Sequence, residues 1–348
     1  MSFSQFLKRH LAAYPAMEPQ DIGKLCYQAA RGAEHLLSDT DAAARYFYAE
    51  FQKTPPRDVP LCEPISDAFC RVDLGAWKAH GLPASWLFRL FVMTASAPEA
   101  TDLLPDFLAT ADRIMREEKT EDDLAAWTCF LTDYQAAGTP PVHHSDAYRR
   151  AYAPAYRLVR TSLLALLPIL EEMARLAPAN EPLVIAIDGR AASGKTTKAK
   201  QLAAITDGAI IHMDDFFLPP HLRTEERLAE VGGNVHRERF AEEVLPHLSS
   251  PDAFSYGVYD CSVGAICRTR EIGAGTIRIV EGSYAHHPAL GNYAHLKIFS
   301  TVEQDEQMAR ILARNGEAMA ERFRNSWIPA EEAYFTAFAI KERADLVL

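Results

Sequence analysis

The residues from Gly189 to Thr196 have the types and the spacing that binding a phosphate group requires. They read GRAASGKT and match the Walker A pattern, G-x-x-x-x-G-K-[ST], at every fixed position. The two glycines permit turns in which successive backbone N–H groups converge on phosphate oxygens. We therefore predict a nucleotide site with ATP and Mg²⁺ as cofactors, formed by Gly189, Arg190, Ala191, Ala192, Ser193, Gly194, Lys195, Thr196 and Thr197.

Two of these residues have specific predicted roles. Lys195 would reach the β- and γ-phosphates, and the Thr196 hydroxyl would ligate Mg²⁺. An apolar run predicts a strand before the loop, and TTKAKQLAAI predicts a helix after it, whose N-terminus favours anions. The alternative, a glycine-rich turn that only fits the pattern, does not require this strand-loop-helix order.

Acidic residues follow two further predicted strands. Asp214, in HMDDFF, is the preferred catalytic base for an attacking hydroxyl, and Asp215 is a candidate metal ligand. The alternative is that both only cap the following turn. Glu281, in RIVEGSY, is predicted to contact Mg²⁺ directly or through water, with a solvated loop glutamate as the alternative.

Arginines on a later helical segment are candidates for neutralising charge in a transition state. They are Arg310, Arg314, Arg322 and Arg324, and the segment is interrupted at Asn315-Gly316. Arg314 is the first choice for catalysis, because a helix end beside a glycine is a natural mobile lid. Each of them taken alone is also consistent with an ordinary surface arginine.

The pattern of apolar residues predicts two domains. Residues 1–178 show apolar residues three and four apart, which indicates an all-α domain of unknown role. Residues 183–348 alternate short apolar strands with helices, which indicates an α/β fold with a parallel sheet of about five strands and helices on both faces. APANEP, at 177–182, is the predicted linker. The predicted strands are 183–187, 209–213, 276–280, 296–300 and 345–348.

One N-terminal stretch, PPVHHSDAYRRAYAPAYRLVR, concentrates His, Tyr and Arg. Ser145 or Asp146 is expected to cap a long helix through it, which Pro154 and Pro168 would kink or divide. Tyr148, Tyr152 and Tyr156 are four apart and would share one helix face. The arginines would meet an anionic ligand or acidic groups of the other domain; the simpler alternative is an interdomain helix with an aromatic seam. The arginines concerned are Arg149, Arg157 and Arg160.

The overall composition limits the classes of partner. The chain has 348 residues, a formal net charge of −11 and 48 % hydrophobic residues. This charge disfavours a nucleic acid polymer as a partner. No apolar run suggests a signal peptide or a membrane span, and the six cysteines show no metal-binding spacing, so we expect a reduced, cytoplasmic protein. The oligomeric state stays open, a homo-oligomer included.

Taken together, IDGRAASGKTT, HMDDFF, IVEGSYA and the arginine-bearing segment resemble the uridine kinase and phosphoribulokinase group of P-loop kinases, over residues 183–348. The resemblance implies that Asp214 is the base, that Glu281 serves the metal, and that an insertion at about 218–272 binds the acceptor. The implied acceptor-binding residues are Tyr259, Asp260, Arg223, Asn234 and His236. The chain departs from the group in lacking a His after the Tyr-Asp pair and in its long N-terminal region.

The leading hypothesis is therefore a kinase that transfers the γ-phosphate of ATP to a hydroxyl of a small metabolite, such as the nucleoside uridine. A second hypothesis is a nucleotide-dependent switch whose N-terminal domain binds a protein partner. A third keeps the kinase and replaces the acceptor by a sugar, a sugar phosphate or a coenzyme precursor, which one polar pocket can equally accept.

Overall fold

The computed structural model describes residues 2–33, 37, 39–97, 101–177 and 181–348. The chain forms two compact units, Met1–Leu167 and Pro168–Leu348. This division precedes the predicted linker, of which residues 178–180 lie outside the described part of the chain. No described helix combines the length and the apolar character that a membrane crossing requires.

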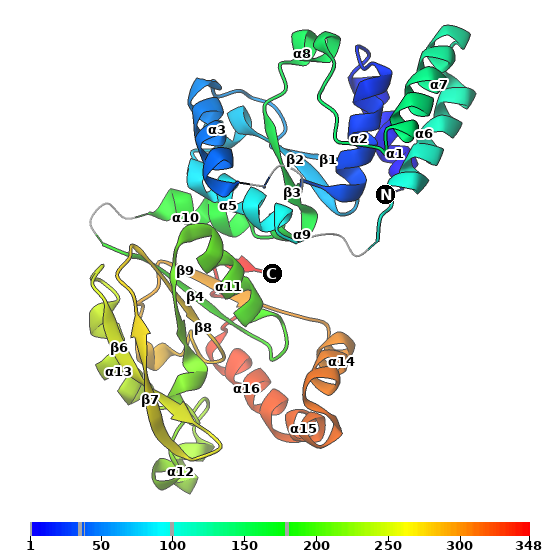
Figure 1. Ribbon diagram of the computed structural model, residues 1–348. Helices are drawn as coiled ribbons and strands as arrows, with labels where there is room; N and C mark the ends of the chain where they lie inside the picture. The colour runs from blue at the N-terminus through cyan, green and yellow to red at the C-terminus, as the bar shows by residue number, and fades with distance from the viewer. Residues whose placement is uncertain (1, 34–36, 38, 98–100, 178–180) are drawn as a thin grey trace. The chain divides into compact units, whose positions relative to one another are not determined.

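The N-terminal unit contains a sheet, so the prediction of an all-α domain is wrong. Its three strands pair antiparallel in the order β1-β2-β3, with helices packed around them (Figure 1). The strands are β1 Cys62–Pro64, β2 Phe69–Asp73 and β3 Tyr156–Arg160. The helices are α1 Phe3–Ala13, α2 Pro19–Arg31, α3 Thr40–Lys53, α4 Leu74–Ala79, α5 Ala84–Ala95, α6 Leu104–Glu118, α7 Glu121–Ala136, α8 Asp146–Tyr152 and α9 Thr161–Leu164.

The long helix predicted to begin near residue 145 is also divided. Ser145 does cap α8, because its side chain accepts a hydrogen bond from the Tyr148 amide at 3.1 Å. The helix ends at Tyr152, where Ala153 takes a left-handed φ of 42° and Pro154 cannot continue the hydrogen-bond pattern. Tyr156 consequently lies on β3 and does not share a helix face with the other tyrosines. Helical structure resumes in α9 and in α10, Leu167–Leu176.

The C-terminal unit is built on a parallel sheet of five strands, which confirms the predicted α/β class. The strand order is β10-β9-β4-β8-β5, and every neighbouring pair is parallel. The five predicted strands all form, close to their predicted bounds: β4 Leu183–Gly189, β5 Ala209–His212, β8 Ile277–Glu281, β9 Leu296–Ser300 and β10 Leu346–Val347.

Helices cover both faces of this sheet. Helix α11, Lys195–Thr206, packs against β4, β5 and β8 on one face. On the other face, Val184 and Ala186 of β4 belong to a buried cluster with Phe240 and Tyr334. These two aromatic residues come from α13, Arg237–Glu243, and α16, Ile328–Phe338.

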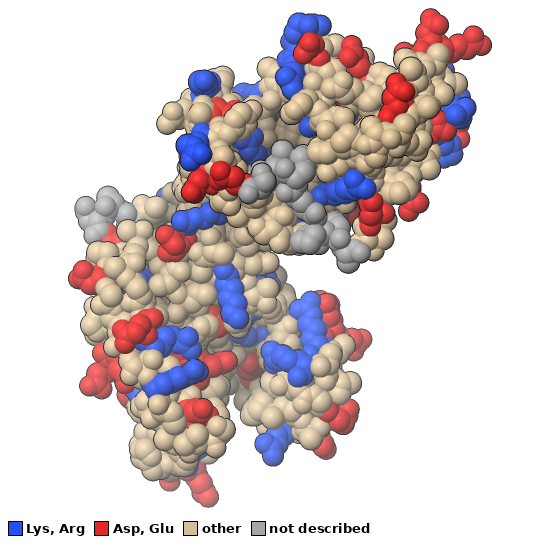
Figure 2. Space-filling view, in the orientation of Figure 1, with Lys and Arg blue, Asp and Glu red and all other residues tan. Residues whose placement is uncertain are grey.

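Two projections extend from the sheet of the C-terminal unit. One carries the antiparallel strands β6, Phe254–Asp260, and β7, Ala265–Ile272, with α12, Glu225–Ala229. The other carries α14, Gln304–Asn315, and α15, Glu317–Arg322, followed by a π-helical turn that leads into α16. Figure 2 shows the unit hollowed between these two projections.

Candidate functional site

The loop between β4 and α11 is the predicted phosphate-binding loop, and its glycines are required by its geometry. Gly189 has φ +133°, and a Cβ there would lie 2.0 Å from the Ser300 carbonyl oxygen. Gly194 has φ +89°, a conformation that other residues rarely adopt. The loop therefore passes close to β9 at Gly189 and makes a left-handed turn at Gly194, where α11 begins.

This loop leaves hydrogen-bond donors available where α11 begins. Gly194 is the N-cap, and among the described residues no side chain caps the helix. The first amides of a helix have no intrahelical acceptor, so those of Lys195, Thr196 and Thr197 can serve a bound anion. The buried Ser193 hydroxyl likewise has no hydrogen-bond partner within the described structure.

Two lysines lie against the same loop. The Lys195 ammonium donates to the carbonyl oxygens of Gly189, at 2.7 Å, and Arg190, at 2.9 Å. The Lys198 ammonium donates to the Ser193 carbonyl at 2.9 Å, and burial lowers the pKa of this lysine. Lys198 lies outside the Walker A pattern, so the motif did not identify it. The sequence feature that could have identified it is its position one helical turn after Gly194.

Thr196 and Glu281 form the part of the site that suits a metal ion. The Thr196 hydroxyl donates to Glu281 Oε2 at 3.0 Å, and Glu281 is 4 % exposed at the end of β8. The other carboxylate oxygen of Glu281 is bound by His212 Nδ1. A hydroxyl and a carboxylate are suitable Mg²⁺ ligands, since this ion takes one or two carboxylates and fills its remaining positions with phosphate and water. The described residues contain no group of three or more His, Cys, Asp or Glu that would hold a metal alone.

The neighbouring aspartates after β5 have different environments. Asp214 lies in a 3₁₀ turn, Met213–Phe216, and is exposed to solvent as a residue, although protein atoms surround much of its carboxylate. The resulting desolvation, and secondly the negative charge of Glu281, raise the pKa of Asp214. A carboxylate with a raised pKa is a stronger base for a hydroxyl proton.

Asp215, by contrast, is 7 % exposed and already bonded. Its Oδ2 accepts from Arg270 Nε at 2.8 Å and from the Tyr256 hydroxyl at 3.0 Å. Arg270 lies on β7 and Tyr256 on β6, so this aspartate fixes the β6–β7 pair to the edge of the sheet. The Asp215 carboxylate, which was predicted to bind the metal, therefore forms an internal ion pair with Arg270.

Most residues predicted to bind the acceptor have partners within the protein. Tyr259 is 5 % exposed, and its hydroxyl accepts from Arg223 at 3.2 Å. Asp260 is exposed at the β6–β7 turn and accepts from the Ser262 amide and hydroxyl. His236 caps α13, and the Asn234 side chain hydrogen-bonds to Tyr284.

Among the arginines of α14, Arg310 reaches the loop and Arg314 does not. Arg310 Nη1 donates to the Ala192 carbonyl at 3.0 Å. Arg314, the first choice from the sequence, donates to the neighbouring Asn315 side chain at 2.8 Å beside the helix break. Arg322 and Arg324 are exposed. The contact to Ala192 makes Arg310 the better candidate in this structure.

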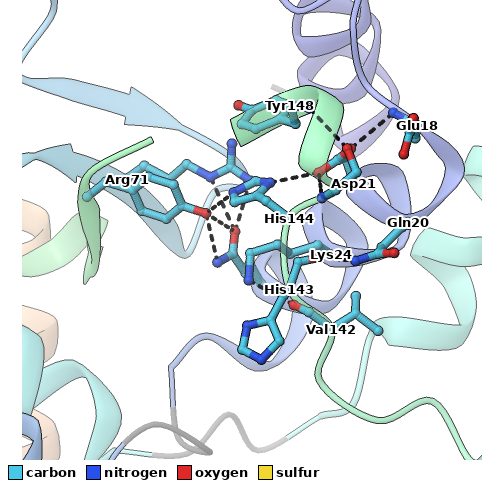
Figure 3. Close-up of polar contacts among 12 residues, drawn as sticks. Glu18, Gln20, Asp21, Lys24, Arg71, Val142, His143, His144 and Tyr148 are labelled. Carbon is cyan, nitrogen blue, oxygen red and sulfur yellow. Dashed lines mark hydrogen bonds and ion pairs between the residues drawn. The ribbon is translucent and has the colours of Figure 1, made fainter. Parts of the chain in front are cut away.

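The N-terminal stretch rich in His, Tyr and Arg contributes to a second polar cluster, which we call the Asp21 network. Figure 3 shows Asp21, His144, Lys24 and Arg71 turned toward one another from α2, β2 and the segment before α8. The chain of donors runs from Arg71 to Gln28 Oε1, from Gln28 Nε2 to the Tyr156 hydroxyl, from that hydroxyl to His144 Nε2, and from His144 Nδ1 to Asp21.

The charges in the Asp21 network follow from burial and hydrogen bonding. Desolvation lowers the pKa of His144 to about 4, so the ring is neutral at pH 7 and its contact with Asp21 is a hydrogen bond to a carboxylate. Desolvation opposes ionisation of Asp21, but the hydrogen bonds from His144 and Ser145 outweigh it and lower its pKa. Desolvation lowers the pKa of Lys24 to about 8.

Comparison with known proteins gives structural similarity only. No family model matches the chain, and no curated protein does. One similar solved structure is described as a candidate uridine kinase from Bacillus stearothermophilus, with 19 % identity over 54 % of this chain and 100 % of that chain, at a TM-score of 0.42. Another is described as a candidate fructose transport system kinase from Silicibacter, with 22 % identity over 53 % of this chain and 98 % of that chain, at a TM-score of 0.43. Because identity and TM-score are both low, the proposal below rests on the residues of this chain.

Proposed function

We propose that the C-terminal unit is a phosphotransferase that moves the γ-phosphate of ATP to a hydroxyl of a small metabolite. The observation that carries this proposal is the combination of open helix amides at Lys195, a hydroxyl-carboxylate pair at Thr196 and Glu281, and the solvent-open base Asp214. A nucleotide-dependent switch needs the first two features but has no use for the third.

The residues divide the work as follows. The amides at the start of α11 bind phosphate oxygens, and Lys195 exchanges its two carbonyl partners for the β- and γ-phosphates. Asp214 accepts the proton of the acceptor hydroxyl as that oxygen attacks phosphorus. Arg310, which already lies on the loop, neutralises charge on the transferring group. Mg²⁺, when bound at Thr196 and Glu281, would neutralise phosphate charge.

The acceptor belongs to the class of small hydroxyl compounds, with nucleosides such as uridine, sugars and coenzyme precursors as members. Tyr259 and Arg223 bond to each other, so neither distinguishes a base from a sugar. A panel of these compounds, assayed for ATP-dependent phosphorylation by mass spectrometry, identifies the acceptor.

Lys195→Ala tests the assignment directly. We expect turnover to fall at least about 1,000-fold, because the lysine supplies charge to the transferring phosphate. Lys200→Ala is the matched control, since Lys200 is exposed on the same helix and lies outside the pattern. Turnover of Lys195→Ala near that of the control would contradict the proposal, as would slow ATP hydrolysis with no phosphorylated metabolite across the panel.

A further inference from the structure

The first half of the phosphate-binding loop is held by helices that lie far along the chain. The Ala191 amide donates to Glu331 Oε2 of α16 at 2.9 Å. The Ala191 carbonyl accepts from Gln307 Nε2 of α14 at 3.0 Å. Both backbone polar groups of Ala191 are therefore bonded to α14 and α16, the first helix of the projection and the helix that follows it.

Apolar contacts reinforce the same attachment. A small buried cluster, separate from the main core of the unit, joins the loop to the projection. Its members are Ala191, Ile311 and Ala320, with Ala192, Met308, Phe323 and Ile328 packed against them. The loop alanines are thus part of the packing of this projection.

Glu331 connects this attachment to the metal-binding edge of the site. The residue is 7 % exposed, and its Oε1 accepts from the Ser283 hydroxyl at 2.6 Å. Ser283 stands two residues after Glu281, in the segment that follows β8. One buried carboxylate therefore joins the phosphate-binding loop to the segment that carries the candidate metal ligand.

The conformation of the next residue explains why this support matters. Ala192 has a φ of 58°, in the left-handed region that non-glycine residues seldom occupy. Such a conformation costs of order 1–3 kcal/mol and persists when surrounding contacts fix it. The residues that follow it, Ser193 to Lys195, lead directly into the open amides.

We propose that Glu331 is a positioning residue of the nucleotide site, whose carboxylate fixes Ala191 so that the following amides converge on the phosphates. This inference rests on the proposed function, because it assigns a role within the same site. Loss of the carboxylate lets the loop relax before ATP binds, so the effect falls on nucleotide affinity and leaves the transfer step nearly unchanged.

Glu331→Ala and Glu331→Asp test the inference through the dissociation constant of Mg²⁺-ATP, measured by titration calorimetry on the full chain. We expect Glu331→Ala to raise it about tenfold, the effect of about one lost buried hydrogen bond. Glu331→Asp keeps the charge but withdraws the carboxylate by one methylene, and should raise the dissociation constant at least about threefold. Glu331→Gln retains an acceptor for the Ala191 amide and should stay within about twofold of wild type.

Two further measurements separate positioning from general stability. The exposed Glu321 of α15 provides a control variant, Glu321→Gln, which should bind as wild type. The kcat of Glu331→Asp at saturating ATP should stay within about twofold of wild type once the acceptor is known. If Glu331→Ala and Glu331→Asp both bind Mg²⁺-ATP as tightly as wild type, the inference is wrong while the proposed function stands. If wild type itself binds no Mg²⁺-ATP, the proposed function fails first.

Discussion

The phosphate-binding loop and the Asp21 network both gather polar groups, but they differ in whether those groups have partners. In the loop, the amides that open α11 have no capping side chain within the described residues, and the Ser193 hydroxyl is buried without a hydrogen-bond partner. In the network, Asp21 accepts four hydrogen bonds, two of them from Ser145.

This is the difference that we expect between a binding site and a structural scaffold. An unpaired buried hydroxyl such as that of Ser193 is costly, so a loop that retains one is explained when an anion completes it. A network in which each donor already has an acceptor stabilises the elements it joins and has little left to offer a ligand. The Asp21 network connects α2, β2, β3 and the segment before α8 in this way.

Asp214→Asn is expected to have the largest effect of the variants that follow, and it concerns the nucleotide site and not the Asp21 network. The amide cannot take a proton from the acceptor hydroxyl, so we expect kcat to fall about 100- to 10,000-fold with Mg²⁺-ATP affinity nearly unchanged. Steady-state kinetics with the identified acceptor, alongside calorimetry, measure the two quantities. Unchanged kcat would transfer the role of base to another group.

Removal of the Asp214 carboxylate should also alter the pH profile. The raised pKa means that the base is protonated at a higher pH than an ordinary carboxyl. Activity should therefore decline as pH falls through that pKa, and the decline should be absent from the residual activity of Asp214→Asn.

Arg310→Ala is expected to have the next largest effect. Because Arg310 contacts the Ala192 carbonyl, its removal should lower kcat/KM for ATP about 10- to 100-fold. Arg314→Ala, on the same helix but hydrogen-bonded to the neighbouring Asn315 side chain, is the matched control and should stay within about twofold. A larger loss in Arg314→Ala would instead support a catalytic role for Arg314, the arginine first favoured by the sequence.

The sequence predicted the parallel sheet because each of its strands is a short, nearly uninterrupted apolar run between helical segments. β2, whose sequence is FCRVD, could not be recognised in the same way, since its buried Arg71 is acceptable only beside Gln28 and Glu63. β3 was missed because Tyr148, Tyr152 and Tyr156 repeat at a helical interval.

The arrangement of the candidate site was predictable where local sequence determines geometry. Lys195 and Thr196 begin the helix after the loop that follows β4, and Asp214 lies in the turn after β5, so all three lie at the same end of the parallel sheet. Asp215 could not be separated from Asp214 by sequence, because its partner Arg270 lies on a strand 55 residues away. Glu331 lies on a helix without any motif, and only the folded contacts indicate its role.

Acidification is expected to have a smaller effect, a loss of stability confined to the N-terminal unit that contains the Asp21 network. His144 has its pKa lowered to about 4 in the fold, against about 6.5 when unfolded, so the unfolded state binds more protons between these values. The contribution of His144 to the stability of the N-terminal unit is therefore fully present above pH 6.5 and declines as pH falls toward 4. At pH 5 we expect this contribution to be smaller by about 2 kcal/mol.

Hydrogen exchange of the α2 and β3 amides at pH 7 and pH 5, corrected for intrinsic rates, measures this loss in the full chain. His144→Gln should abolish the pH-dependent part, whereas His143→Gln, at the exposed neighbouring position, should leave it intact. Equal pH dependence in both variants would show that His144 is not the titrating group.

Ser145→Ala gives the smallest effect and tests whether the network is more than a set of ordinary helix caps. The Ser145 hydroxyl accepts from the Tyr148 amide and donates to Asp21 Oδ2 at 2.6 Å, so its loss removes a cap and also weakens a buried carboxylate. We expect about 1–2 kcal/mol less protection from hydrogen exchange in α8 and α2. Thr120→Ala removes the exposed cap of α7 and should cost about 0.5–1 kcal/mol, in α7 alone. Equal and purely local losses of protection in the two variants would mean that the hydrogen bond from Ser145 does not stabilise the Asp21 carboxylate.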